Sequence, residues 1–482
     1  MLCCSTLWCV SSYADIHSHF NQIKNNPVQL YNFFHQMPKG GELHYHLAGG
    51  PSAETMLALV ANKEYCIHPQ TFVISKTEGH CSGISTTELT PDWLQKIIAS
   101  WSMEGFQPGK ESSHDHFFDS FMKFMPIVVE YRIALVADVL KHAGEQHELY
   151  MEIMDIPDDA YSATFGNTIK NLPTLAEKHQ YLLADPAFLK TITNTVSRAE
   201  QLEPQAKESL QCTTHPQNQG CQVEARFLYY VLREQDLDSF IAQAVHGFEA
   251  VSRSKGALVG MNLVQAEDGV ISLRDYQEQM QVFKYLHHYY PNVHIALHAG
   301  ELTPQLVPTK ELKGHIKDAL FTGKAERIGH GTDIRYESNL KQTLTYMRQH
   351  EIPVEINQTS NLKILDIPNK DIPLVFYLNH QVPVVLSTDD EGILRTDLTT
   401  QYVNAAMEHH LSYKVLKQLN RNTLTYAFIA GASLWQHAPT AQPVTACLHL
   451  DSADCLNFIA KSPKAKLQWI LEKKLSQFEA LF

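Results

Sequence analysis

Short apolar runs alternate along the chain with longer stretches in which apolar residues recur at helical spacing. Eight of the runs read as buried strands, because each is short and is bounded by polar or glycine-containing turns. They are Glu42–Leu47, Leu149–Met154, Val223–Val231, Ala257–Val264, Val293–His298, Arg327–His330, Pro353–Asn357 and Pro383–Ser387. Strands that alternate with helices in this way predict an α/β protein, a (β/α)8 barrel of the TIM type.

The segments between the strands divide into two kinds. Asp275–His288 and Glu337–Gln349 carry apolar residues at intervals of three and four, as the outer helices of a barrel require. Two other intervals are too long for one βα unit, and we expect insertions there, at about 60–110 and 157–222. Such insertions are expected at the barrel mouth, so residues 15–482 are predicted to form one barrel domain.

Composition and charge narrow the class of partner. Hydrophobic residues make up 44% and charged residues 19% of the chain, which is typical of a globular protein. The formal net charge of −13 disfavours nucleic acid and anionic membranes as partners. No apolar run reaches the roughly 18–20 residues that span a bilayer. A small molecule is therefore the expected partner.

The first residues and the cysteines bear on the compartment. Residues 1–14 resemble a signal peptide, apolar to Val10, although the basic start is missing because the first lysine is Lys24. Six cysteines follow, in three neighbouring pairs separated by 15, 9 and 8 residues. They are Cys66 and Cys81, Cys212 and Cys221, and Cys447 and Cys455. We expect local disulfides and a secreted or periplasmic protein; the alternative is six reduced thiols in a cytoplasmic enzyme.

The first candidate site lies in GELHYHLAGG. Alternation along a strand places His44 and His46 on one face with Cα atoms about 6.6 Å apart, close enough to share one metal ion. Two more H-x-H pairs, His17–His19 and His114–His116, do not end an apolar strand. Because barrel active sites gather where strands end, only the first pair is expected to bind metal.

Three further motifs also end predicted strands. VHIALHAGE places His298 and Glu301 after one strand, and RIGHG ends in His330, for which a buried structural histidine is the competing interpretation. VPVVLSTDDEG delivers Asp389 and Asp390 after the last strand. Since the carboxyl ends of barrel strands meet at one rim, these side chains are expected to converge in a hydrolytic metal site.

PKGGELHYHLAGG, HAGE, RIGHG and STDDEG, in this order, resemble the signature segments of the adenosine and adenine deaminase family, over roughly Met37 to Leu434. The resemblance implies a single zinc ion per chain. Its ligands would be His44, His46, His298 and Asp389.

The same resemblance implies the remaining roles. Glu301 would donate a proton to purine N1, His330 would orient the attacking hydroxide, and Asp390 would contact the purine near N7. His46 and Gln265 would also face the substrate. The implied reaction is hydrolytic deamination of adenosine and deoxyadenosine to inosine and ammonia.

Two departures from the family pattern leave the substrate open. Ala48 stands where many members carry a polar residue that helps hold the ribose, and Gln265 replaces a glycine that approaches the base. Adenine or a modified adenine nucleoside therefore competes with adenosine as the substrate. A related two-metal hydrolase and a non-catalytic nucleoside-binding protein are the competing classes. The polynucleotide deaminases are excluded, because neither half of their zinc signature forms here.

The arrangement of an export-like leader before an insertion with Cys66 and Cys81 is similar to the secreted growth-factor-type adenosine deaminases. That similarity again favours the outside of the cell. Nothing in the pattern fixes the oligomeric state, and a homodimer stays open.

Overall fold

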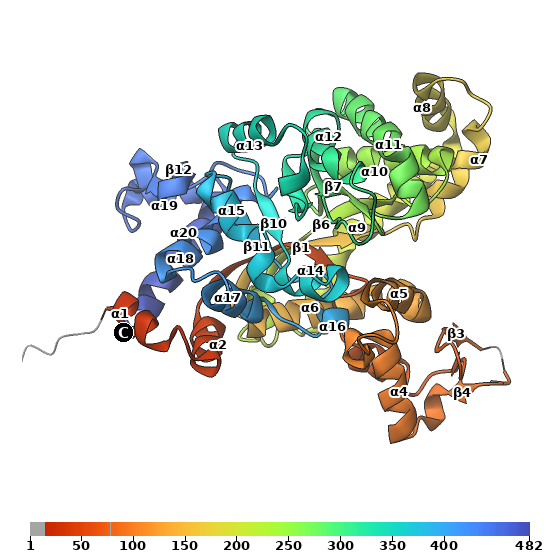
Figure 1. Cartoon of the computed structure of the whole chain (residues 1–482), viewed down its shortest axis with the longest axis horizontal. Coiled ribbons are helices and arrows are strands. Elements are labelled where there is room, and N and C mark those ends of the chain that lie inside the picture. Colours follow the sequence, from red (N-terminus) through yellow and green to blue (C-terminus); the bar gives the residue numbers. More distant parts are fainter. Residues whose placement is uncertain (1–14, 78) are drawn as a thin grey trace, which may run out of the picture.

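The computed structural model describes residues 15–482 except residue 78, so the predicted leader lies outside the described residues. Eight parallel strands form the central sheet (Figure 1). They are β1 Lys39–His46, β5 Glu148–Asp155, β6 Glu224–Leu232, β7 Leu258–Val264, β8 His294–Ala299, β9 Arg327–His330, β10 Val354–Ile356 and β11 Val384–Leu386. All eight predicted strands are confirmed, with ends that differ by a few residues.

The strands follow one another in chain order around a nearly closed barrel. The first and last strands meet at a bridge between Tyr45 and Asp389, where the His46 amide donates to the Asp389 carbonyl at 3.1 Å. The Asp389 amide in turn donates to the His44 carbonyl at 3.2 Å. The predicted (β/α)8 barrel is therefore confirmed, and it closes at residues of the candidate site.

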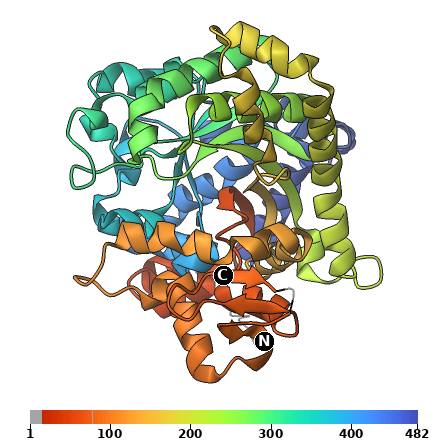
Figure 2. The same ribbon diagram turned by 90° about the vertical axis from the view of Figure 1, so that its right-hand side faces the viewer.

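Helices surround the barrel (Figure 2). The outer ones are α6 Arg132–Glu145, α9 Pro186–Ser209, α10 Leu237–Arg253, α11 Val270–Tyr289, α12 His315–Phe321, α13 Leu340–Gln349, α15 Leu374–Asn379 and α18 Tyr413–Tyr426. The two amphipathic stretches noted in the sequence form α11 and α13, and each turns its apolar residues inward.

The connection from β1 to β5 carries the first long insertion. A small antiparallel sheet of β2 Tyr65–Ile67, β3 Ile74–Lys76 and β4 Ile84–Ser85 projects from the body with α4 Pro91–Trp101 (Figure 1). A disulfide between Cys66 and Cys81 closes it. The next helix, α5 Ser113–Glu130, returns to the barrel and packs on α14 Gln358–Leu365, which directly follows β10. The start of α5 therefore lies beside the carboxyl ends of the strands.

Residues 157–222 form the second long connection. Helices α7 Gly166–Ile169 and α8 Leu175–Ala184 lead into α9, which packs against α6 and α10 on the outside of the barrel. The segment ends at the disulfide between Cys212 and Cys221. The third disulfide joins Cys447 to Cys455 beside α19 Ala453–Ile459, so all three predicted local pairings are confirmed.

The ends of the described chain pack together. Phe33 of α2 Pro27–Gln36 lies 5.1 Å from the ring of Phe478, which belongs to α20 Pro463–Glu479. The short helices α1 Ile16–Ile23, α3 Ala53–Val60, α16 Glu391–Leu394 and α17 Leu398–Met407, and the hairpin of β12 Trp435–His437 and β13 Gln442–Pro443, complete the structure. No helix among the described residues has the length and apolar character to cross a membrane.

The interior of the barrel is filled in layers. Apolar side chains of β5, β6, β7 and β8 meet inside it and pack with the ring of Phe428. On the same face of β5 as Met154, Glu152 pairs with Arg327 of β9. The strands are thus buried on both faces, which explains their continuous apolar runs.

Candidate metal centre and active site

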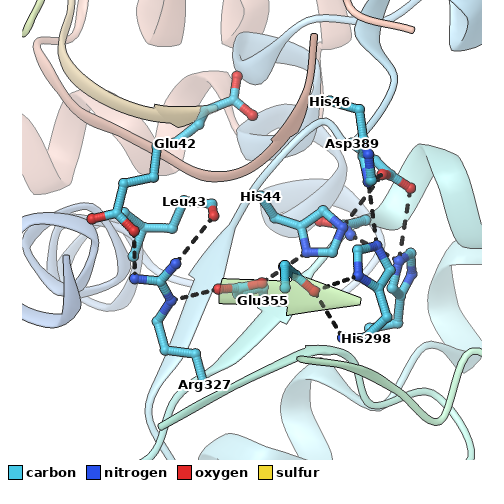
Figure 3. A network of polar contacts seen from close by, with 12 residues as sticks. Glu42, Leu43, His44, His46, His298, Arg327, Glu355 and Asp389 are labelled. Atoms are coloured by element: carbon cyan, nitrogen blue, oxygen red, sulfur yellow. Dashed lines mark hydrogen bonds and ion pairs between the residues drawn. The ribbon is translucent and has the colours of Figure 1, made fainter. Parts of the chain in front are cut away.

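The four predicted metal ligands converge at the carboxyl ends of three strands (Figure 3). His44 and His46 come from β1, His298 from β8, and Asp389 directly follows β11. The Nε2 atom of His46 lies 3.2 Å from Nε2 of His298 and 3.1 Å from Oδ1 of Asp389. The Nε2 atom of His44 lies 3.3 Å from the same carboxylate oxygen. Residues far apart along the chain therefore present their donor atoms to one point.

This arrangement fits a metal ion. The His44 Nε2 atom is buried and has no hydrogen-bond partner among the described residues. Donor atoms of His44, His298, His330 and Asp389 all lie within 4.8 Å of one another, and His46 shares Asp389 with them. Imidazole nitrogens combined with one carboxylate are a donor set that suits zinc.

A second ring of polar groups orients these side chains. The His44 Nδ1–H donates to Glu355 at 2.7 Å, and the His298 Nδ1–H donates to the Asn262 side-chain oxygen at 2.9 Å. The Ser360 hydroxyl donates to Asp389 Oδ2 at 2.7 Å. Each hydrogen bond leaves Nε2 or the other carboxylate oxygen free to bind a metal.

These contacts determine the pKa values of the proposed ligands. Burial lowers the pKa of His44, but its close contact with Asp389 and its hydrogen bond to Glu355 outweigh burial and raise that pKa to about 10. Burial and the charge on His44 keep the pKa of His298 well below its usual value. The close contacts with His44 and His46 outweigh burial and hold the pKa of Asp389 well below its usual range. A metal that binds here would displace the proton between His44 and Asp389.

Two carboxyl groups near the centre are set up to be protonated. Burial, followed by the charge on Asp389, raises the pKa of Glu301 well above its ordinary value. The same two causes raise the pKa of Asp390. Each can therefore act as a hydrogen-bond or proton donor at neutral pH, which an ionised carboxylate cannot do.

His330 lies between the metal ligands and Glu301. Burial lowers its pKa to about 4, so the ring is neutral. Its Nδ1–H donates to the side-chain oxygen of Asn361 at 3.0 Å, which leaves Nε2 as an acceptor, 3.4 Å from the Asn357 amide nitrogen and 3.8 Å from Asp389. The Glu301 carboxyl lies 3.6 Å from Nδ1. A neutral imidazole in this orientation can accept a proton from water.

The two positions that depart from the family pattern lie at the rim. Gln265 directly follows β7, is exposed, and its side-chain oxygen accepts from the Glu234 amide at 2.9 Å. Ala48 is half-buried after β1. The next residue, Gly49, packs so closely against Asp390 that an added Cβ would lie 1.9 Å from its Oδ1 atom. The glycine therefore leaves the space that Asp390 occupies.

The backbone is strained where the strands end. Positive φ angles occur at three of these residues: 81° at Gln265, 65° at His330 and 72° at Asp389. Residues other than glycine rarely adopt this conformation. Such strain clusters at functional sites, where the surrounding structure holds it in place.

The other H-x-H pairs do not join the centre. His17 and His19 lie on α1, and His114 and His116 lie on α5, where residues two apart point in different directions. His114 contacts Asp268, beyond β7, at 2.9 Å. The sequence pattern did not predict this contact across the mouth of the barrel.

Nor did the sequence pattern predict Asn262, Glu355 and Ser360, which orient the ligands. The only signal is a polar residue inside an otherwise apolar strand, as for Glu355 in PVEIN.

Comparisons with known proteins agree with this geometry. The model of the adenosine deaminase family matches residues 137–433. Human N6-methyl-AMP deaminase is 22% identical over 407 residues, covering 83% of this chain and 92% of that protein. Adenine deaminase from Arthrobacter aurescens has a similar fold, with a TM-score of 0.55 at 16% identity over 84% of this chain and 97% of that one. Arabidopsis ADAL, in complex with IMP, gives 0.54 at 16% identity over 93% and 99%.

A barrel with histidines and acids gathered at the carboxyl ends of its strands defines a hydrolase whose residues can hold a metal. More particularly, the chain belongs to the adenosine deaminase family, and it is a hydrolase of the deaminase type.

Proposed function

We propose that this protein catalyses the zinc-dependent hydrolytic deamination of adenosine and deoxyadenosine to inosine and ammonia. The observation that carries the proposal is the convergence of three imidazoles and one carboxylate near the buried carboxyl group of Glu301, whose pKa burial raises.

His44, His46, His298 and Asp389 would hold the zinc ion, one per chain. When bound, zinc supplies a Lewis acid that lowers the pKa of a coordinated water to about 7.

The other side chains would handle the protons. Glu301, which its surroundings keep protonated, donates to purine N1 and withdraws electron density from C6. His330 accepts a proton from the attacking water at Nε2. Asp390, also protonated, donates a hydrogen bond to N7, and Gln265 contacts the substrate from the rim. The exocyclic amine takes the proton from His330 and leaves as ammonia, while the C6 hydroxyl returns a proton to Glu301 and becomes the carbonyl of inosine.

A second candidate is an adenine derivative modified at N6, or adenine itself. Human N6-methyl-AMP deaminase aligns with 83% of this chain, and Ala48 offers no polar group to a ribose. Hydrolysis at C6 and the proposed roles of Glu301 and His330 are the same for each of these substrates, although an N6-methyl substrate releases methylamine in place of ammonia.

A substrate panel tests the proposal. Purified protein is mixed with adenosine, deoxyadenosine, adenine, N6-methyladenosine and N6-methyl-AMP, with and without a chelator, and ultraviolet absorbance is followed. We expect the highest kcat/KM with the two unmodified nucleosides and loss of turnover with chelator. A preference for a methylated or phosphorylated substrate favours the second candidate, and no turnover of any purine contradicts both.

We also propose that the protein works in an oxidising compartment, outside the cytoplasm. The three disulfides support this, because such bonds persist in secreted and periplasmic proteins. Mass spectrometry of unreduced peptides from the native source tests the proposal. Three linked pairs are expected, and six free thiols at these positions would contradict it.

A further inference from the structure

A buried carboxylate outside the proposed ligand set holds the backbone that carries Glu301. Glu267 follows β7 and is only 1% exposed. One of its oxygens accepts the Gly300 N–H at 3.0 Å, and the other accepts the Glu301 N–H at 2.8 Å. Both oxygens are therefore engaged by two consecutive amides of one turn.

The turn is shaped to receive a carboxylate. Gly300 has a φ of +77°, and a Cβ atom there would lie 2.5 Å from Asp333 Oδ1, so only glycine fits. This conformation aims the amides of Gly300 and Glu301 at the same point, and successive amides arranged in this way bind anions. Without Glu267 both buried amides would lose their acceptor.

Glu267 is itself held from two sides. The His315 Nδ1–H donates to it at 2.5 Å, and the His315 ring is stacked on Tyr276 with centroids 3.8 Å apart. The Arg233 guanidinium lies 3.9 Å from its other oxygen and donates to the His298 carbonyl at 3.1 Å. Burial raises the pKa of Glu267, but the contact with His315 outweighs burial and brings that pKa to about 2, so the group is ionised.

The ion pair of Arg233 and Glu267 thus fixes the backbone from His298 to Glu301 by hydrogen bonds. Arg233 holds its first carbonyl, and Glu267 holds its last two amides. The Glu301 carboxyl faces the His330 ring at 3.6 Å, too far for a hydrogen bond, so its direction depends on this backbone. A displacement of about 1 Å of a catalytic group costs on the order of 100-fold in rate.

We propose that Glu267 is a positioning residue for the proton donor Glu301, with His315 holding it in place. The inference rests on the proposed function, because it assigns Glu301 the transfer of a proton to purine N1. Glu267 lies outside the proposed metal ligands and substrate contacts. Its effect is therefore expected on turnover and not on zinc content or binding of the ground state.

The test compares Glu267→Gln with wild type. Glutamine keeps the size of the side chain but offers one acceptor oxygen to two amides. We expect kcat for adenosine to fall about 10- to 100-fold, the range seen when an outer partner is lost. KM should stay within about threefold and zinc content should stay at the wild-type value, since only the transition state uses the Glu301 proton.

A second readout separates positioning from general damage. A 6-hydroxy-1,6-dihydropurine riboside carries at N1 the proton that Glu301 delivers, whereas 1-deazaadenosine has a carbon atom in place of N1 and cannot receive it. Glu267→Gln should weaken inhibition by the dihydropurine in proportion to the fall in kcat, and leave inhibition by 1-deazaadenosine unchanged. Equal weakening of both inhibitors, or an unchanged kcat, would overturn the inference.

Glu203→Gln is the matched control. Glu203 of α9 is a half-buried carboxylate that also accepts a backbone N–H, that of Ala225 at 3.2 Å, but this contact lies at the start of β6, at the opposite end of the barrel from the Glu301 turn. Its kcat should stay near wild type, and a fall equal to that of Glu267→Gln would overturn the inference.

If Glu267→Gln does not fold, the His315→Phe variant tests the inference instead. Phenylalanine keeps a ring on Tyr276 and removes the donor to Glu267, so kcat should fall about 3- to 10-fold with KM unchanged; a normal kcat would overturn the inference. Wild-type protein that turns over no purine would remove the proposed function and this inference with it. An active wild type with a normal Glu267→Gln variant would remove the inference alone.

Discussion

The barrel contains two layers of buried polar groups that differ in how completely they are paired. In the lower layer, near the start of the strands, Arg327 pairs with Glu152 and with Glu355 at 2.6 Å each and lies 3.8 Å over the ring of Phe428. In the upper layer, polar atoms of His44, Asn357, Asn361 and Asp390 have no hydrogen-bond partner among the described residues. In the lower layer the opposite charges pair with one another, whereas in the upper layer atoms such as His44 Nε2 and Asp390 Oδ1 are left over for a ligand.

The two layers are linked through one histidine. Glu355 accepts from Arg327 with one oxygen and from His44 with the other (Figure 3). A charge pair that stabilises the barrel therefore also fixes the orientation of a proposed metal ligand. The contrast shows that burial and charge alone do not identify a site; in the upper layer the unpaired polar atoms also gather with the proposed metal ligands.

The largest fall in activity is expected for a substitution beside the upper layer, at Glu301. Glu301→Gln removes the proton donor but keeps the shape, so kcat should fall by about 10² to 10⁴. Zinc content and thermal stability should stay near wild type, because Glu301 lies outside the set of four proposed ligands. Steady-state kinetics with metal analysis check this, and near-normal turnover would remove Glu301 from the acid role.

A change in the lower layer should affect stability instead. Arg327→Met leaves Glu152 and Glu355 without their shared cation in a buried place, which should lower the free energy of unfolding by about 3–5 kcal/mol. Chemical denaturation measures the change. Arg335→Met serves as the control, because Arg335 is also a cation that lies over an aromatic ring, that of Phe376. This change should lower the free energy of unfolding by less than about 1 kcal/mol. Equal losses in the two variants would contradict the view that the lower layer is a paired structural unit.

A weaker effect is expected at Asp333, a buried acid that belongs to neither layer. Its two carboxyl oxygens have no hydrogen-bond partner among the described residues, and burial followed by the charge on Glu267 raises its pKa well above the usual value. The unfolded chain loses this proton near pH 4, so the native state loses stability as pH rises above about that value. Asp333→Asn does not titrate and should gain on wild type by about 1 kcal/mol for each pH unit above about pH 4, until the pH reaches the raised pKa. Melting curves across this range test the sign, and a gain confined to low pH would contradict it.

The fold and the proposed ligands could be predicted because both follow from short-range pattern. An apolar run that ends in His298 or Asp389 shows a strand and its functional end at once. The partners could not be predicted in the same way. Glu355 and Asn262 acquire their roles only when β10 and β7 lie beside the strands of the ligands, and the contact of His114 depends on how a long insertion packs. Such contacts are set by tertiary packing and leave no local signal.

Deamination is expected to need one zinc ion held by His44, His46, His298 and Asp389. The decisive experiment titrates zinc into chelator-treated protein and measures turnover of adenosine at each step. We predict that activity rises linearly and stops at one zinc per chain, and that His44→Ala abolishes both binding and activity. Full activity without metal, or a requirement for two ions, would contradict this expectation.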